Sequence, residues 1–332
     1  MNNQHHDHVH WGLLGLLGFL TLTAFILSMA VGRSGAGPNI TLWPSGDTGA
    51  VIFTQIRLPR ALLGLLVGGS LGLAGAALQG LLRNPLAEPG VLGASSGAAL
   101  GAVVAFYFGF AQFSTLALPL AGVIGALLAL GIIYLLSGKS GDILTLVLAG
   151  VAINALAAAL TSLALNFAAS PYAALEILFW MLGSLADRSL EHVALVFPIM
   201  ACGWLGLIVA ARGLDALILG EDGARSLGFE PSLLKLFVLG GTALAVGSAV
   251  AVTGVVGFVG LVVPHLLRPL VGYRPSRLLL PAFLAGALLT LAADIVIRMM
   301  PPGPELKLGV VTALVGAPFF LHLVIKTRRE ST

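Results

Sequence analysis

The stretch ALLGLLVGGSLGLAGAALQGLL, residues 61–82, carries no charge and is long enough to cross a bilayer as one α-helix. Its many Gly, Ala and Ser residues predict close packing against neighbouring helices. Similar uncharged runs occupy residues 11–31, 91–113, 116–136, 143–167, 193–211, 236–267 and 308–325, and the run 278–297 contains one charge, Asp294.

Of 332 residues, 58% are hydrophobic and 9% charged, which excludes a soluble domain or a nucleic-acid-binding protein. The unbroken runs predict an all-α polytopic membrane protein rather than a barrel of alternating strands.

The run 236–267 exceeds one span by about half, and its centre, TGVVGFVG at 253–260, is weakened as a helix by glycine. If the run holds two helices, the chain has ten spans, and eleven Lys and Arg lie on the membrane side of the N-terminus and six on the opposite side. With nine spans, the N-terminal side would hold seven Lys and Arg and the opposite side ten. Since basic residues concentrate in cytoplasmic loops, we expect ten spans with both termini cytoplasmic. Short or broken helices are expected near 253–271, a kind tolerated where it packs on protein or lines a cavity.

The sequence predicts a single membrane domain at 11–326, between cytoplasmic tails at 1–10 and 327–332. The tail histidines His5, His6, His8 and His10 are interpreted as part of a disordered polar terminus, not as a metal site. Cys202 lies in an apolar run, and as the single cysteine it predicts a buried thiol without a disulfide.

Ionisable residues are almost absent from the spans, which favours a transport protein over a membrane enzyme. Asp294 lies four residues before Arg298, so both share one helix face, and we expect mutual neutralisation. A proton relay would need a second acid. Because an ion-coupled carrier usually needs intramembrane carboxylates, energy from a separate ATPase is favoured. A secondary carrier and a structural scaffold remain the alternatives.

Two polar regions outside the spans are candidate contact surfaces. On the cytoplasmic side, residues 212–235 (RGLDALILGEDGARSLGFEPSLLK) allow Leu219, Ala224 and Leu227 to share one face of a short helix. This pattern fits either a docking helix or a solvated loop. On the outer side, three arginines predict a surface for an acidic partner or anionic ligand, or for lipid phosphate: Arg57, Arg60 and Arg298.

Collinear motifs from residue 57 to the C-terminus resemble the FecCD-type permeases of binding-protein-dependent ABC importers for iron chelates, haem and cobalamin. The motifs are RLPR at 57–60, QGLLRNPLAEPGVLGASSG at 79–97, LAGVAINAL from 148, FWMLGSL from 179, LGEDGARSLGF from 219, GFVGLVVPHLLR from 257 and LGVVTALVGAPFF from 308. The resemblance implies a cobalamin-permease-like fold in the bacterial cytoplasmic (inner) membrane. It agrees with the ten spans derived from charge.

The resemblance also implies partners and a substrate class. Two copies would form a homodimer with the pathway at their interface, two ATP-binding subunits below and a periplasmic or lipoprotein substrate-binding protein above. The chain itself would bind no cofactor, since ATP and Mg would be held by the ATPase. Ferric siderophore or haem is the expected substrate, favoured by FWMLGSL and LGEDGARSLG, and cobalamin is the alternative.

Site residues follow from the matching motifs. The resemblance assigns ATPase coupling to Leu219, Gly220, Glu221, Ala224, Arg225, Leu227 and Gly228. It assigns binding-protein docking to Arg57, Arg60 and Arg298, and a cytoplasmic gate within Asp142–Thr145 to Ile143 and Leu144. Two residues depart from the family pattern: Lys307 stands where relatives commonly have proline, and Gly223 weakens the coupling helix by about 1 kcal/mol relative to alanine.

Overall fold

Long apolar helices make up most of the chain in the computed structural model, which describes residues 2–34, 37–41, 46–114, 116–138, 143–168, 170–301 and 303–330. Seven of the described helices are long and apolar enough to cross a membrane, and three more are apolar but shorter, at Ala94–Tyr107, Val259–Val271 and Leu308–His322. These ten correspond in order to the ten predicted spans, which confirms the predicted fold class.

The first half of the chain contains the elements α1 (Asn2–Ala30), β1 (Val31–Ser34), β2 (Gly37–Ile40), α2 (Gly46–Val51), the π-helix η1 (Ile52–Arg57), α3 (Leu58–Leu81), α4 (Ala94–Tyr107), α5 (Phe110–Phe113), α6 (Ala117–Ser137), α7 (Ile143–Asn166) and α8 (Pro171–Met181). Two regions depart from the sequence prediction. The histidine-rich terminus is helical from Asn2 instead of disordered. The connection before residue 61 contains an antiparallel hairpin, with Val31 opposite Ile40, and a helix continuous from Gly46 into α3.

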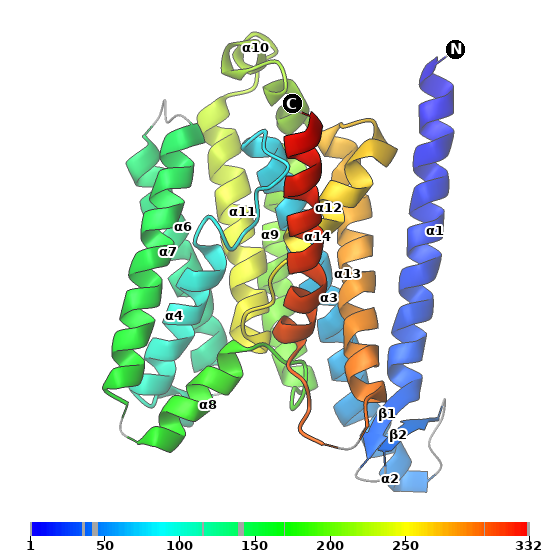
Figure 1. The fold of residues 1–332 in the computed structure, drawn as a ribbon, viewed down its shortest axis with the longest axis vertical. Helices are drawn as coiled ribbons and strands as arrows, with labels where there is room; N and C mark the ends of the chain where they lie inside the picture. The colour runs from blue at the N-terminus through cyan, green and yellow to red at the C-terminus, as the bar shows by residue number, and fades with distance from the viewer. Residues whose placement is uncertain are drawn as a thin grey trace.

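The second half contains α9 (Leu190–Leu217), α10 (Glu221–Ser226), α11 (Pro231–Thr253), α12 (Val259–Leu267), the 3-10 helix η2 (Arg268–Val271), α13 (Pro275–Met299) and α14 (Leu308–Glu330). Both chain ends lie at the end of the bundle that carries α10, and the β1–β2 hairpin lies at the opposite end (Figure 1). We call these the α10 end and the hairpin end. Helix α14 continues past the predicted boundary of the C-terminal tail, to Glu330.

Small residues bring the central helices together, as the glycine-rich sequence predicted. Helix α3 is buried along most of its length and packs against α13, α9, α11 and α12. A Cβ added at Gly68 or at Gly286 would overlap the backbone carbonyl of the other residue. Glycine at these two positions therefore allows α3 and α13 to touch through their backbones.

The predicted break within residues 253–271 is present. Helix α11 ends at Thr253, residues 254–257 are not helical, and α12 begins only at Val259. Gly254 and Phe258 both adopt positive φ, at 74° and 67°. The backbone N–H of Phe258 donates to Glu88 Oε1 at 2.6 Å, so a carboxylate stands beside the start of α12, where free backbone donors and the helix dipole favour negative charge.

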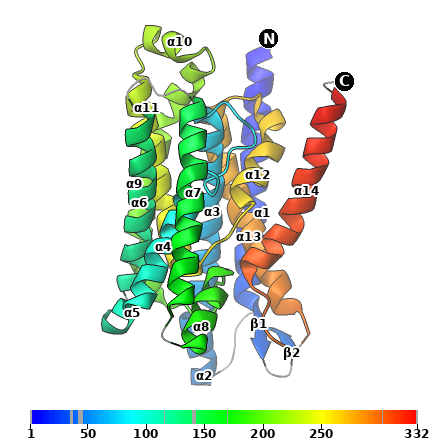
Figure 2. The same cartoon turned by 60° about the vertical axis from the view of Figure 1, so that its left-hand side comes forward.

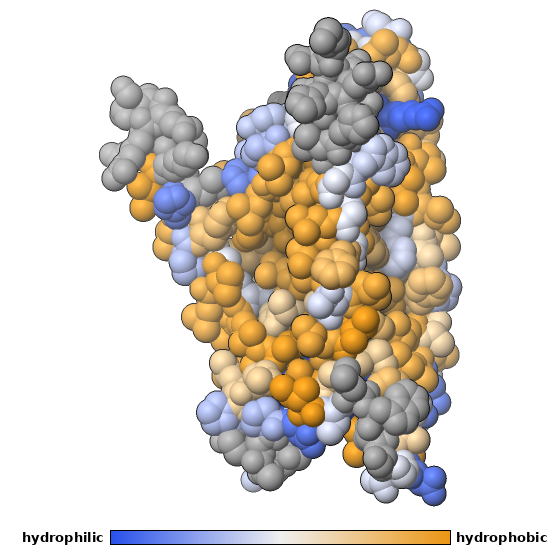
Figure 3. Space-filling view, turned by 90° about the vertical axis from the view of Figure 1, so that its right-hand side faces the viewer, coloured by the Kyte–Doolittle hydropathy of each residue, from blue (hydrophilic) through white to orange (hydrophobic). Residues whose placement is uncertain are grey.

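The surface is apolar around the middle of the bundle and more polar toward both ends (Figure 3). This distribution is the one expected for a protein surrounded by lipid. Helix α14 leans away from the other helices (Figure 2) and packs mainly against α12 and α13. Cys202, predicted to be buried, is exposed on α9, because its neighbours Met200 and Gly203 occupy the inward face instead.

Candidate functional site

The coupling residues predicted from sequence lie in a short helix, α10, and in the turns on either side of it, and this segment projects from the α10 end of the bundle (Figure 1). Gly220 and Gly228, on either side of it, have φ values of 91° and 84°, which glycine adopts without strain. At its C-terminal end the N–H of Gly228 donates to Arg225 O and the N–H of Phe229 to Ala224 O, both at 2.9 Å. This is the Schellman pattern, so the two glycines define where the helix starts and stops.

Charged side chains fix α10 internally and against α11. The Glu221 carboxylate lies 3.2 Å from Arg225 Nη2 on its own helix and 3.0 Å from Lys235 Nζ on α11. Arg225 Nη1 also lies 2.9 Å from Asp222 Oδ1. Lys235 is buried at 3% exposure, whereas the Asp222 side chain is fully exposed. Glu221 therefore links the projecting helix to a buried charge of the bundle.

The apolar residues of this segment do not share one face as predicted. Leu219 and Leu227 are 70% and 58% exposed at its two ends, whereas Ala224 is fully buried. The reason is that α10 is only six residues long, so Leu219 and Leu227 fall in the turns beside it. The polar segment predicted at 212–235 is also shorter, because its first residues belong to α9 and its last to α11.

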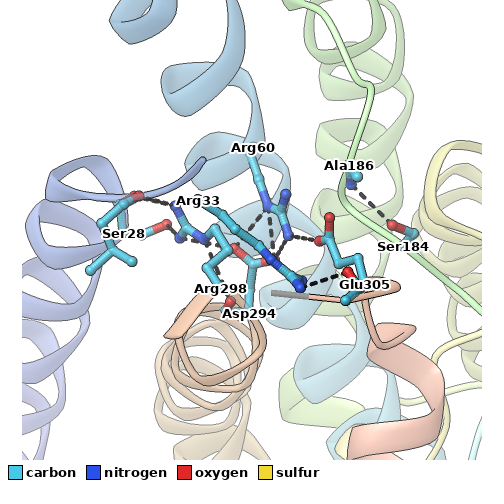
Figure 4. A network of polar contacts seen from close by, with 10 residues as sticks. Ser28, Arg33, Arg60, Ser184, Ala186, Asp294, Arg298 and Glu305 are labelled. Atoms are coloured by element: carbon cyan, nitrogen blue, oxygen red, sulfur yellow. Dashed lines mark hydrogen bonds and ion pairs between the residues drawn. The ribbon is translucent and has the colours of Figure 1, made fainter. Parts of the chain in front are cut away.

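Asp294 at the hairpin end bridges two arginines. Its Oδ1 lies 2.8 Å from Arg60 Nη2 and its Oδ2 lies 2.9 Å from Arg298 Nη2 (Figure 4). The predicted neutralisation of Asp294 by Arg298 is thus confirmed, and Arg60 is a second partner that the sequence spacing did not reveal. Glu305 pairs with Arg60 from the segment between α13 and α14. Two carboxylates therefore balance two guanidinium groups.

Hydrogen bonds to the backbone tie the same region to α1. Arg298 Nη1 donates to Ser28 O at 2.7 Å and to Val31 O at 2.6 Å. Arg57, 6% exposed, donates through Nη1 to Ala30 O at 2.9 Å and to Thr41 O at 2.7 Å. Arg57 and Arg298 thus donate hydrogen bonds to backbone carbonyl groups where α1 ends and the hairpin begins.

The three arginines predicted to receive a binding protein are therefore engaged within the chain. Arg57 and Arg298 are buried, and the Arg60 side chain is 11% exposed. Docking of an acidic partner on these residues stays a prediction. Lys307, which could add charge there, is half-buried at the start of α14.

Three glycines meet where α8, α11 and α14 converge. A Cβ at Gly183 would lie 2.6 Å from Val255 O, one at Gly309 would lie 2.5 Å from the same oxygen, and one at Gly254 would overlap Trp180 O. Backbone hydrogen bonds join the three segments, including Ser184 N to Thr253 O at 2.7 Å and Leu308 N to Gly183 O at 2.8 Å. We call Gly183, Gly254 and Gly309 the glycine junction.

A groove of about 700 Å³ opens beside the glycine junction. It runs between the broken segment before α12 and the face of α14, and its lining residues are Met181, Leu182, Val255, Gly257, Phe258, Gly309, Val310, Ala313, Leu314, Ala317, Pro318 and Leu321. The broken segment therefore borders this groove, while α12 itself packs against α3 and α13. The lining is almost entirely apolar.

The predicted gate lies only partly within the described residues. Asp142 is outside them, and Ile143 is the first residue of α7. Leu144, in the first turn of α7, is 61% exposed. The helix begins at the α10 end of the bundle (Figure 1), but the gating role stays a prediction.

The ten apolar helices of the described residues, the break before α12 beside a groove and the projecting charged helix at one end define a polytopic membrane permease. The chain belongs to the FecCD transport family, whose model matches residues 20–326. It is an ABC importer permease of that family.

Similarity to individual relatives extends over almost the whole chain. The vitamin B12 import system permease protein BtuC of Escherichia coli O9:H4 (strain HS) is 38% identical over 327 residues, covering 98% of each chain. The same protein of Salmonella typhi is 38% identical over 331 residues, with equal coverage. A solved structure described as an inward-facing metal-chelate type ABC transporter is 33% identical and superposes with a TM-score of 0.85, covering 95% of this chain and 99% of that one.

Proposed function

We propose that this permease imports cobalamin, using energy from ATP hydrolysis in a separate subunit. The observation that carries the proposal is the 38% identity to the vitamin B12 import permeases over 98% of both chains. The matched region covers the segments that border the groove as well as the helical core. The iron-complex substrate expected from FWMLGSL and LGEDGARSLG is accordingly the second candidate.

The proposed assembly contains two copies of the chain, two ATP-binding subunits and an outer substrate-binding protein. The α10 segment would receive the ATP-binding subunit through exposed Leu219 and Leu227. The weakly packed α14 and the adjoining groove would face the second copy, and the pathway would run between the two. ATP-driven closure of the ATP-binding subunits would then tilt the helices through the α10–α11 link. In this arrangement the chain hydrolyses nothing and holds no cofactor.

The proposed location is the bacterial inner membrane, with the α10 end in the cytoplasm. Both chain ends lie at the α10 end, and the charge count favours the same side. A cysteine placed at Asp222, which is fully exposed on α10, would test the orientation. It should react with a membrane-impermeant maleimide only after the membrane is opened, and reaction in intact cells would reverse the assignment.

The substrate is tested by uptake into proteoliposomes that contain the permease with its ATP-binding subunit and receive loaded binding protein. We expect accumulation of radiolabelled cobalamin that requires ATP and stops with a non-hydrolysable analogue. An ion gradient without ATP should drive no uptake. ATP-dependent accumulation of another ligand, without cobalamin, would leave the importer class intact and overturn the cobalamin proposal.

A ferric chelate is the competing substrate, favoured by the metal-chelate description of the solved relative. The same vesicles should therefore be supplied with ferric siderophore and with haem. Since the binding protein selects the ligand, each is presented on a binding protein that holds it. Uptake of a ferric siderophore or haem alone would support this second candidate.

A further inference from the structure

A polar cavity of about 250 Å³ lies at the α10 end of the bundle, between the last turns of α3, the segment η2 and the first turn of α13. Its polar lining residues are Gln79, Arg83, Arg268 and Tyr273, and none of the described residues that line it is acidic. The volume is below the range of about 300–1,000 Å³ typical of sites for drug-sized ligands. The cavity therefore suits a small anionic group rather than a whole transported molecule.

The two guanidinium groups keep most of their donors available to the cavity. Gln79, 1% exposed, donates through Nε2 to Leu261 O at 3.3 Å and accepts at Oε1 from Arg268 Nη2 at 2.8 Å. Among the described residues this is the one side-chain hydrogen bond of Arg268, and the Arg83 side chain makes none. Since each guanidinium carries five N–H donors, Gln79 orients Arg268 and leaves the others for a ligand.

Backbone strain is concentrated at the same cavity. Four described residues other than glycine adopt positive φ, and two of them, Arg83 at 47° and Tyr273 at 61°, line this cavity. Local hydrogen bonds hold both turns, from Arg83 N to Gly80 O at 3.3 Å and from Tyr273 N to Arg268 O at 3.1 Å. Such strain gathers at ligand sites, where it fixes the direction of a side chain.

The surroundings point to a lipid as the source of the anion. Arg268 directly follows the apolar helix α12, and Leu266 and Leu270 beside it are 54% and 53% exposed. Tyr273, 65% exposed, stands at the edge of the cavity. Arginine and tyrosine at the end of an apolar span, next to exposed leucines, match the boundary between headgroups and acyl chains.

Asp215, near the C-terminal end of α9, bonds to Ser276 and forms no described ion pair with Arg83 or Arg268. Asp215 Oδ1 accepts from Ser276 N at 2.9 Å, and its Oδ2 accepts from Ser276 Oγ at 2.5 Å. We propose that the cavity binds the phosphate of an anionic phospholipid headgroup through Arg83 and Arg268, with the acyl chains along Leu266 and Leu270. This site is independent of the transported substrate.

The test uses the full-length permease in nanodiscs of phosphatidylcholine, with or without phosphatidylglycerol. Native mass spectrometry measures retained phosphatidylglycerol, and thermal unfolding measures the shift in midpoint that it causes. We expect the double variant Arg83→Gln, Arg268→Gln to retain the anionic lipid about thirtyfold more weakly. Arg274→Gln is the matched control, because Arg274 is exposed at the same end and does not line the cavity.

Each outcome decides the proposal. If the double variant and Arg274→Gln lose equal amounts of bound phosphatidylglycerol, the effect comes from general surface charge, and the proposed site is wrong. Inorganic phosphate is added to the permease in phosphatidylcholine nanodiscs as a further test. If it raises the unfolding midpoint as much as phosphatidylglycerol does, the ligand is free phosphate and not a lipid. If the double variant retains the lipid unchanged but co-purifies less ATP-binding subunit, the cavity binds a carboxylate of that subunit and not a lipid. If the double variant does not fold, the single variant Arg83→Gln serves, because its side chain makes no described hydrogen bond.

Discussion

Glu221 on α10 and Lys235 on α11 form an ion pair of 3.0 Å, in which Lys235 is almost completely buried. The pair connects the helix that projects from the bundle to one that passes through its centre, where α11 packs on α9, α6 and α3. Any force applied to α10 therefore reaches α11 through a buried charge as well as through the short turns beside it.

Glu221→Gln should weaken this connection. Lys235 would lose the carboxylate, and we expect a loss of about 2 kcal/mol in stability together with less transport per ATP hydrolysed. Thermal unfolding and coupled uptake and ATPase assays measure the two effects. Asp222→Asn is the control, since that side chain is fully exposed. If both variants transport equal amounts of substrate per ATP hydrolysed, the ion pair between Glu221 and Lys235 has no mechanical role.

Leu219→Ser and Leu227→Ser should weaken binding of the ATP-binding subunit without unfolding the permease. Both leucines are exposed in the isolated chain, so their removal costs little stability. If each is buried by the partner, its loss removes about 1.5–3 kcal/mol of binding free energy, which is tenfold or more in affinity. Titration of the ATP-binding subunit against the purified permease gives the dissociation constant. Unchanged affinity in both variants would place the contact elsewhere.

Asp294→Ala should destabilise the hairpin end strongly. Arg60 and Arg298 would lose the carboxylate that lies between them, and breaking a buried ion pair from one side costs about 3–5 kcal/mol. Glu305→Ala is the matched comparison. Its side chain is 29% exposed, so its removal should cost about 1 kcal/mol or less. Equal thermal midpoints for the two variants would show that Asp294 does not hold this region.

Docking of an acidic binding protein on Arg60 would compete with Glu305. Glu305→Gln removes that competitor, so it should strengthen docking, and the gain should shrink as salt rises because partly exposed charges are screened. Surface plasmon resonance at several salt concentrations measures the affinity. An affinity unchanged by the substitution and by salt would exclude Arg60 as the contact.

Gly254→Ala should disrupt the glycine junction. The new Cβ would overlap Trp180 O, and the residue would keep a φ of 74° that favours glycine. Gly240→Ala is the control on the same chain segment, because no atom lies within 4 Å of its added Cβ and alanine favours the helix by about 1 kcal/mol. We expect opposite shifts of the thermal midpoint. A shift of the same sign would refute the packing assigned to Gly254.

The sequence predicted the spans well because each is a local feature. An apolar run such as 61–82 needs only its own residues to indicate a bilayer helix, and the glycines near 254 indicated the break. The hairpin at 31–40 was missed, since its strands are short and carry no clear alternation of polar and apolar residues. The helical turns that precede α3, in α2 and η1, were missed because polar residues such as Thr54 and Gln55 interrupt the apolar pattern.

The site was only partly predictable, because its polar contacts join distant parts of the chain. Asp294 and Arg298 are four residues apart, and helical periodicity alone predicted their pairing. Arg60 lies 234 residues before Asp294, and no local pattern indicates that contact. For the same reason the sequence did not show that Arg57 would be buried against the end of α1.

The break before α12 also constrains how the protein enters the membrane. The nine residues of α12 and the four of η2 together extend about 22 Å, less than the hydrocarbon thickness of about 30 Å. We therefore expect α12 with η2 to be too short to span the bilayer as an independent segment. We expect α12 to enter the bilayer together with α13, which follows it through the short connection at 272–274, since both helices pack against α3. The length of this one helix would then set the order in which the last helices enter the membrane.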